Sequence, residues 1–192
     1  MEQPVPAVSP VGRGRSIRES FQSYERRRRP RICAYRRNHR SSPPKGNRRK
    51  RGTQNQAIGR SRGGLTTKIV ALVDALGNLV RFLLLPGQAH DMKGVAPLIR
   101  GVSFDALLAD KAFDADWLLQ DLDQRGATAV IPPKANRKIQ RDFDTEVYKW
   151  RHLVENYFAK IKEFRRIATR YDKTDCSYAA CWNLVATLIA SR

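Results

Sequence analysis

The sequence predicts an α/β layer fold with a mixed sheet, preceded by a segment of different character. Short apolar runs rich in β-branched residues alternate with stretches whose apolar residues recur every three to four positions. The net charge of +19 is uneven, because residues 1–64 hold 18 basic and three acidic residues whereas residues 65–192 hold 19 and 15. No apolar run approaches the ~20 residues of a membrane-spanning helix. We therefore expect a protein that has no membrane segment and whose charge favours a nucleic-acid partner.

Residues 1–53 are predicted to be disordered and to form a separate segment from the domain at 54–192. Six of the ten prolines lie in residues 1–44, and arginine-rich runs at 26–29 and 48–51 have no periodic apolar residues around them. Such a segment cannot bury enough apolar surface to offset its ordering entropy. It is interpreted either as a DNA-binding arm or as a solvated tail.

The globular part opens with a β-hairpin. Apolar runs at 68–73 and 79–85 flank turn residues at 74–78, and Pro86-Gly87 ends the second run. A helix then follows at 91–100, and its apolar side is expected to consist of Val95, Leu98 and Ile99.

Two further strands with a helix between them come next. Residues 104–109 read as a buried strand that ends at Asp110, and residues 127–131 read as another. The amphipathic stretch at 114–125 between them ends at Gly126. Its inward residues are expected to be Trp117, Leu118 and Leu122.

Two helices close the chain after a polar, basic loop at 134–145. The helix at 177–190 is strongly apolar, so its Trp182 is expected in the core. The helix at 146–167 is amphipathic. Its apolar positions are Val147, Trp150, Val154, Phe158 and Ile161.

Polar residues that suit phosphoryl transfer fall at two places in this arrangement. Asp110 lies where a buried strand ends, the edge at which open α/β sheets place their chemistry. Tyr148, Arg151, Glu155 and Lys162 follow one another at helical spacing and line one stripe of the long helix. Carboxylates are ligands for Mg²⁺ or Mn²⁺, and cations hold phosphates. The structural alternatives are a helix cap for Asp110 and an intrahelical ion pair with Arg151 for Glu155.

The pattern Tyr148-x2-Arg151-x3-Glu155-x6-Lys162 resembles the C-terminal signature of bacterial insertion-sequence transposases of the DDE type. The group that it most resembles is the insertion-sequence-five branch of the insertion-sequence-four superfamily. Three further blocks resemble that family's blocks in its order, and the likeness runs from about Gln54 to Arg192. These blocks are Gly59–Lys68, Pro86–Asp91 and Ala109–Asp114.

This resemblance implies an RNase H-like mixed sheet and metal-dependent DNA strand cleavage and strand transfer. Asp110 matches the second acidic metal ligand and Glu155 the third, with Mg²⁺ or Mn²⁺ as the cofactor. Tyr148, Arg151 and Lys162 match the signature residues that contact DNA phosphates. The implied partners are insertion-sequence ends, target DNA and further copies of the chain. The implied location is the bacterial cytoplasm, at the nucleoid.

The first catalytic aspartate of that family has no counterpart here. Residues 1–53 contain no aspartate, and the first one, Asp74, lies in the expected hairpin turn. Asp74 and His90 are therefore weak candidates for the site, and His90-Asp91 also fits a turn with a helix cap. We interpret residues 1 to about 52 as translated out of frame relative to the transposase, which removes the first, central strand of the sheet. Such a chain is expected to be inactive alone and marginally stable. The alternative function is that of a non-enzymatic, basic nucleic-acid-binding protein.

Overall fold

A computed structural model describes residues 31–34, 56–62 and 64–191, the first of these ranges as backbone only. The strands are β1 Arg31–Ala34, β2 Gly59–Ser61, β3 Gly64–Asp74, β4 Leu79–Pro86, β5 Ala106–Leu108 and β6 Thr128–Val130. The short 3₁₀ helices are η1 Asp91–Gly94, η2 Lys111–Phe113 and η3 Lys149–Arg151. The α-helices are α2 Val95–Ile99, α3 Asp116–Gln124, α4 Thr145–Tyr148, α5 His152–Lys162, α6 Arg165–Ala168 and α7 Asp175–Ala190.

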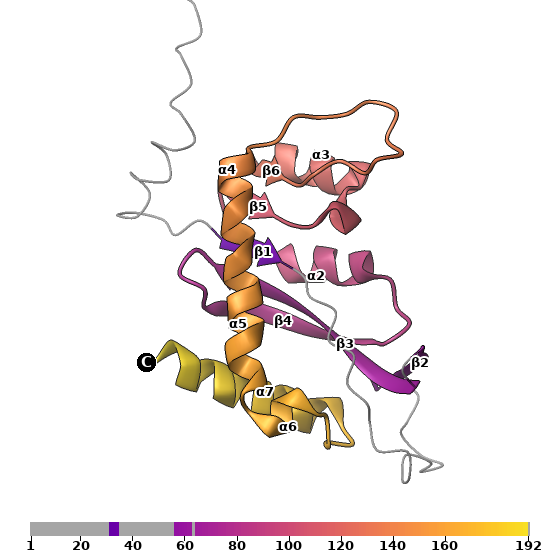
Figure 1. Ribbon diagram of the computed structural model, residues 1–192, viewed down its shortest axis with the longest axis vertical. Helices are drawn as coiled ribbons and strands as arrows, with labels where there is room; N and C mark the ends of the chain where they lie inside the picture. The colour runs from indigo at the N-terminus through magenta and orange to yellow at the C-terminus, as the bar shows by residue number, and fades with distance from the viewer. Residues whose placement is uncertain (1–30, 35–55, 63, 192) are drawn as a thin grey trace, which may run out of the picture.

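The strands form a mixed arrangement with β3 at its centre. Strand β3 pairs antiparallel with β4 on one side and with β1 on the other, and β2 pairs with its first residues. Strands β5 and β6 pair in parallel, and β1 contacts β5. The strands therefore follow one another in the order β4, β3, β1, β5, β6, with α5 crossing them (Figure 1). This confirms the predicted mixed α/β fold with flanking helices.

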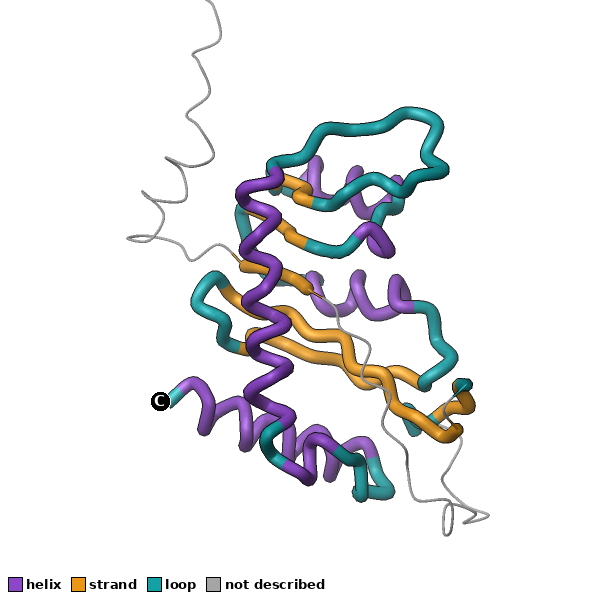
Figure 2. The backbone as a smooth tube through the Cα atoms, viewed as in Figure 1, coloured by secondary structure: helices purple, strands orange, loops and turns teal. Residues whose placement is uncertain are grey.

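The continuous apolar run in β3 is explained by helices on both of its faces. Val70 and Leu72 pack with α2 and α3, whereas Ile69, Ala71 and Val73 pack with α5 and α7. Side chains alternate between the two faces of a strand, so both sets are buried in different cores. Trp182 of α7 is fully buried in the second core, as predicted. Figure 2 shows the strands lying between these helices.

The hairpin between β3 and β4 is held by Asp74. Its carboxylate oxygen Oδ1 accepts hydrogen bonds from the backbone N–H groups of Leu76 and Asn78, each at 2.9 Å. Gly77 takes a positive φ of 83°, a conformation that suits glycine. The predicted turn is therefore confirmed, and Asp74 has a structural function in it.

The expectation that the sheet lacks a strand between β3 and β5 is wrong for the backbone. Strand β1 occupies that place and pairs with Ala71–Asp74, the last four residues of β3. Ladder hydrogen bonds use backbone groups, so a segment without a strand-type side-chain pattern can still supply them. The remaining residues of the predicted disordered segment, up to residue 53, lie outside the described residues.

Two tryptophans predicted to be inward lie partly exposed. Trp117 lies beside the fully buried Leu118, and the inward side of α3 consists of Leu118 and Leu122 with the partly buried Leu119. Trp150 falls in the 3₁₀ turn η3, and Tyr157 is buried in α5 in its stead. A 3₁₀ turn rotates the chain by a different angle per residue than an α-helix does. Apolar residues before and after the turn therefore no longer point to the same side of the helix.

The long predicted helix also ends earlier than expected. The helical stretch from Thr145 ends at Lys162, and Phe164 adopts an extended conformation before the short α6. The helices at 91–100, 114–125 and 177–190 are present with shifted ends, and Gly126 stops α3 with a φ of 67°. Among the described residues, no helix has both the length and the apolar character needed to span a membrane.

Arg170 is a buried structural cation rather than an exposed residue of a basic surface. Its side chain is 0% exposed and donates to Thr67 Oγ1 at 2.6 Å and to Asp175 Oδ1 at 2.6 Å. Its guanidinium also lies over the Tyr178 ring, 5.1 Å from the centroid. The other oxygen of Asp175, Oδ2, accepts from the backbone N–H of Ala57. Arg170 thus fastens the first residues of the domain to the start of α7.

Candidate active site

Asp110 lies just after β5. Strands β5 and β6 are parallel, so both of their carboxyl ends lie at the edge of the sheet where Asp110 is found. It occupies the N-cap position of η2, but its side chain makes no capping hydrogen bond there. The structure therefore does not support the alternative that Asp110 serves as a helix cap. Its carboxylate is 34% exposed and turns instead to the helix that carries the signature residues.

Arg151 joins the two candidate metal ligands. Its Nη1 lies 3.1 Å from Asp110 Oδ1, and its Nη2 lies 2.9 Å from Glu155 Oε1. The intrahelical pair expected as the alternative for Glu155 is therefore present, but the same guanidinium also reaches across to β5. Glu155 remains 45% exposed, so both carboxylates are accessible from solvent. Two acids 45 positions apart in the sequence thus share one cation.

Tyr148 belongs to the same group. Its hydroxyl donates to Asp110 Oδ1 at 3.3 Å, a long and therefore weak hydrogen bond, and Arg151 lies over its ring at 5.7 Å from the centroid. Burial and the negative charge of Asp110 raise the pKa of Tyr148, so the phenol stays protonated. Tyr148 therefore positions Asp110 as a hydrogen-bond donor.

The charges of the acids also act on Arg151. Burial works to lower the pKa of Arg151, but the negative charges of Asp110 and Glu155 outweigh it and raise that pKa. Lys162, the last residue of α5, lies seven residues beyond Glu155 and is half-buried on the same helix. Seven residues are about two helical turns, so Lys162 extends the stripe of Tyr148, Arg151 and Glu155.

The weak candidates do not join this group. Asp74 is used in the hairpin turn described above. His90 caps η1, since its Nδ1 accepts from the backbone N–H of Met92 at 3.3 Å. Asp91 pairs with Lys68 Nζ at 2.5 Å, and both side chains are nearly buried. A turn with a helix cap is therefore present at His90-Asp91, but the expected capping residue, Asp91, is the first residue of η1 and His90 makes the cap.

Sequence reasoning missed Asp114, which holds the basic loop that follows β6. The Asp114 side chain is 1% exposed and pairs with Arg137 and Arg141, each at 2.9 Å. Burial by itself would raise the pKa of Asp114, but these arginines and the backbone N–H of Lys134 lower it below its ordinary value. The one signal in the sequence was the cluster of four cations at Lys134, Arg137, Lys138 and Arg141 in an otherwise nearly neutral domain, and it marks the loop but not the buried Asp114.

The donor chemistry of the site suits a hard divalent cation only in part. Asp110 and Glu155 supply carboxylate oxygens, the ligands that Mg²⁺ and Mn²⁺ prefer. No group of three or more histidine, cysteine, aspartate or glutamate side chains is gathered anywhere in the part of the chain that the structure describes. The two acids therefore fit as part of a metal site that needs a further ligand.

Comparison with known proteins agrees with this geometry. Residues 37–189, most of the chain, match the family model described as "Transposase DDE domain". This chain belongs to the DDE transposase family. A relative from Brucella ovis, named "Putative transposase for insertion sequence element IS6501", is 35% identical over 127 residues. Those residues are 65% of this chain and 98% of the relative. No solved structure matches the chain.

Proposed function

We propose that this chain carries the catalytic core of a DDE transposase that cleaves and joins the DNA strands of an insertion sequence. The observation that supports the proposal is the sharing of Arg151 between Asp110 and Glu155, with Tyr148 bonded to Asp110. Two carboxylates brought together beside cations form an arrangement suited to a phosphodiester in transfer. The insertion-sequence-five branch and an RNase H-like topology are part of the same proposal.

Asp110 and Glu155 are the residues that would hold Mg²⁺ or Mn²⁺. When bound, such an ion supplies a Lewis acid that activates the attacking oxygen and stabilises the leaving one. In the free protein Arg151 pairs with both acids, offsets one of their two negative charges and keeps their side chains together. Tyr148 orients Asp110, and Lys162 extends the positive side of the stripe toward a DNA phosphate.

The chain is proposed to be inactive on its own because it lacks the first carboxylate. The backbone of β1 lies beside β5, yet Arg31-Ile32-Cys33-Ala34 contains no acid. Asp74 is a poor substitute, because its Oδ1 accepts two backbone hydrogen bonds that hold the hairpin turn. Translation of an upstream segment out of frame would explain this loss. Because the family match begins at residue 37, that segment is shorter than the expected residues 1 to about 52. If no neighbouring reading frame encodes an apolar strand ending in an acidic block such as Asp-Ser-Thr, that explanation is wrong.

A plasmid-nicking assay with Mg²⁺ tests the function without knowledge of the element's ends. We expect no nicking by the 192-residue chain and metal-dependent nicking once the upstream segment with its aspartate is restored. In the restored chain, Asp110→Ala and Glu155→Ala should each abolish nicking and leave DNA binding intact. Binding without nicking in the restored chain would instead identify a nucleic-acid-binding protein. Nicking by the 192-residue chain would refute the proposed inactivity.

The partners proposed for the active form are the ends of the insertion sequence, its target DNA and further copies of the chain. All of these would be met at the nucleoid in the bacterial cytoplasm.

A further inference from the structure

The basic loop, defined here as Lys134–Arg141, is fixed in place by one buried carboxylate. Asp114 Oδ2 accepts from the backbone N–H of Lys134 and from Arg137 Nε, each at 2.9 Å, and its Oδ1 accepts from Arg141 Nη2 at 2.9 Å. The backbone carbonyl of Asp114 accepts from Lys134 Nζ at 2.9 Å. Charge-assisted bonds from three points of one loop to one side chain leave the loop little freedom.

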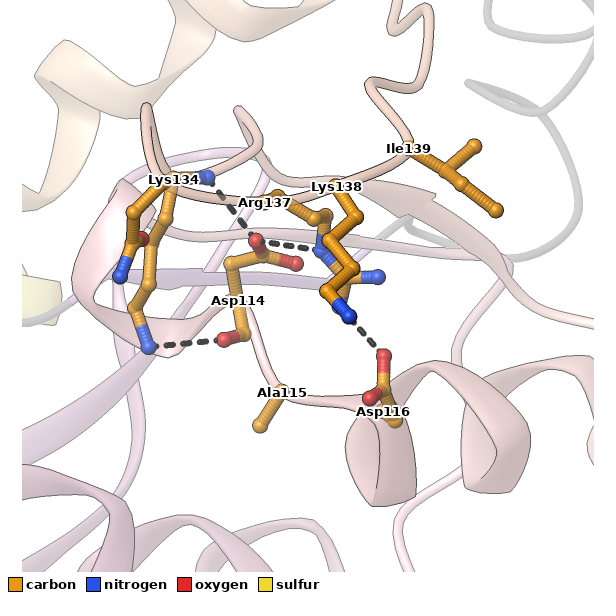
Figure 3. A pocket seen from close by; sticks show the side chains of 8 residues that line it. Asp114, Ala115, Asp116, Lys134, Arg137, Lys138 and Ile139 are labelled. Carbon is orange, nitrogen blue, oxygen red and sulfur yellow. Dashed lines mark hydrogen bonds and ion pairs between the residues drawn. The ribbon is translucent and has the colours of Figure 1, made fainter.

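A pocket of about 370 Å³ lies between this loop and the start of α3 (Figure 3). Its polar wall consists of Asp114, Asp116, Lys134, Asn136, Arg137 and Lys138. Arg137 pairs with both acids of the wall, at 2.9 Å to Asp114 and 2.5 Å to Asp116. Since Arg137 and Arg141 balance the two acids, the ammonium groups of Lys134 and Lys138 give the pocket its excess positive charge.

The strand order places the pocket at the same edge of the sheet as the candidate active site. Strands β5 and β6 are parallel, so both end at the same edge of the sheet. Asp110 follows β5 and the basic loop follows β6, and Asp114 lies only four residues beyond Asp110. Figure 1 shows the loop at the end of the molecule that carries β6 and α4, far from α6 and α7.

We propose that this pocket binds the phosphodiester backbone of DNA next to the scissile phosphate. Lys134 and Lys138 contact phosphate oxygens, Asn136 adds an amide donor, and Asp114 acts as a positioning residue through the loop. A preformed, positively charged concavity on a rigid loop is suited to this ligand, because phosphate contacts fix the register of a strand. The inference rests on the proposed function for its choice of DNA as ligand.

Lysine acylation of the full chain, read by mass spectrometry with and without a 30-base-pair duplex, tests the contact in the unmodified protein. We expect the duplex to lower the acylation of Lys138 and Lys134 several-fold. Lys173, exposed in the bend just before α7, is the internal control and should react equally in both samples. Equal acylation of Lys138 with and without DNA would overturn the proposal, and this test requires no variant that could misfold.

A matched pair of variants measures how much the contact between Lys138 and a DNA phosphate contributes to binding. Removing one cation that neutralises a phosphate of duplex DNA lowers the slope of log Kd against log salt by about 0.9. We expect that change for Lys138→Gln and none for Lys173→Gln, which removes the same charge at the far end of the molecule. The basic N-terminal segment is the same in both variants, so its contribution to the salt dependence cancels when the two slopes are compared. Equal slopes for the two variants would contradict the proposal.

The positioning role of Asp114 has its own readout. Asp114→Asn keeps both lysines, yet we expect it to remove the DNA protection of Lys138 while Lys173 and far-ultraviolet circular dichroism stay unchanged. Retained protection of Lys138 in the folded variant would show that Asp114 has no such role. Asp110→Asn should keep the protection of Lys138 in the 192-residue chain and should abolish nicking in the chain whose upstream segment is restored. An intact footprint without that loss of nicking would contradict the proposed function alone, whereas a lost footprint would contradict this proposal.

Discussion

Arg151 and Arg170 are both arginines bonded to carboxylates, but their surroundings differ. Arg170 is 0% exposed, and its donors go to a hydroxyl, two backbone carbonyls and one acid, all within the domain. Arg151 is partly exposed and shares two acids that are themselves open to solvent. The first arginine completes a buried network, whereas the second holds two carboxylates that retain free coordination capacity.

The difference in exposure indicates that Arg170 stabilises the fold, whereas Arg151 belongs to the candidate active site. A buried ion pair is costly to break because its partner is left desolvated and uncompensated. An exposed group can exchange partners with little loss of stability, because water and ions replace what is removed. Asp114 shares a feature with each arginine. It is buried like Arg170, but its partners Arg137 and Arg141 are partly exposed, as Arg151 is.

The largest expected effect comes from removing Arg170. Arg170→Met should lower the free energy of unfolding by about 3 kcal/mol, because Asp175 and the Thr67 hydroxyl lose a buried partner. Chemical denaturation measures this change. A loss below about 1 kcal/mol, the range of exposed pairs, would remove the distinction between the two arginines.

A smaller effect is expected at Asp114. Asp114→Asn should cost about 2 kcal/mol, since the charge-assisted bonds from Arg137 and Arg141 are weakened. The pKa of Asp114 is lowered in the folded protein, so its contribution is fully present above the unfolded pKa near 3.8 and is lost as pH falls through the folded pKa. The stability of the wild-type chain should therefore decline more steeply below about pH 4 than that of the variant. Parallel acid unfolding curves would contradict this.

The smallest change in stability is expected at Arg151. Arg151→Gln should alter the free energy of unfolding by less than about 1 kcal/mol, because the pair is partly exposed. It should also strengthen Mn²⁺ binding several-fold, since a cation that competes for both acids is gone. Titration calorimetry with Mn²⁺ measures the affinity, and Arg166→Gln, at an exposed arginine paired with Asp172, is the matched control. Weaker Mn²⁺ binding in Arg151→Gln would show that the guanidinium does not compete with the metal.

Much of the fold was predictable because its signals are local. The continuous apolar run in β3, the turn at Gly77 and the helical spacing of Val154, Phe158 and Ile161 can each be read from a short stretch of sequence. The pairing of β1 was not predictable, because backbone hydrogen bonds leave no mark on side-chain patterns. A single 3₁₀ turn at η3 was enough to misplace Trp150.

At the candidate site, sequence reasoning placed Tyr148, Arg151 and Glu155 on one stripe, and the structure brings Asp110 to them. It did not find that one guanidinium joins both acids, since that contact depends on where β5 lies under α5. The burial of Arg170 and Asp114 could not be predicted from the sequence either, because a charged residue is buried only where partners distant in the sequence pair with it.

The most direct test of the account is whether Asp110 and Glu155 hold one metal ion together. Fe²⁺ with ascorbate and peroxide cuts the backbone next to its binding site, and mass spectrometry locates the cuts in the 192-residue chain without any need for activity. The account predicts cuts near residue 110 and near residue 155, both suppressed by excess Mg²⁺ and both lost in Asp110→Asn. Cuts near residue 155 that persist unchanged in Asp110→Asn, or no cuts at either position, would contradict it.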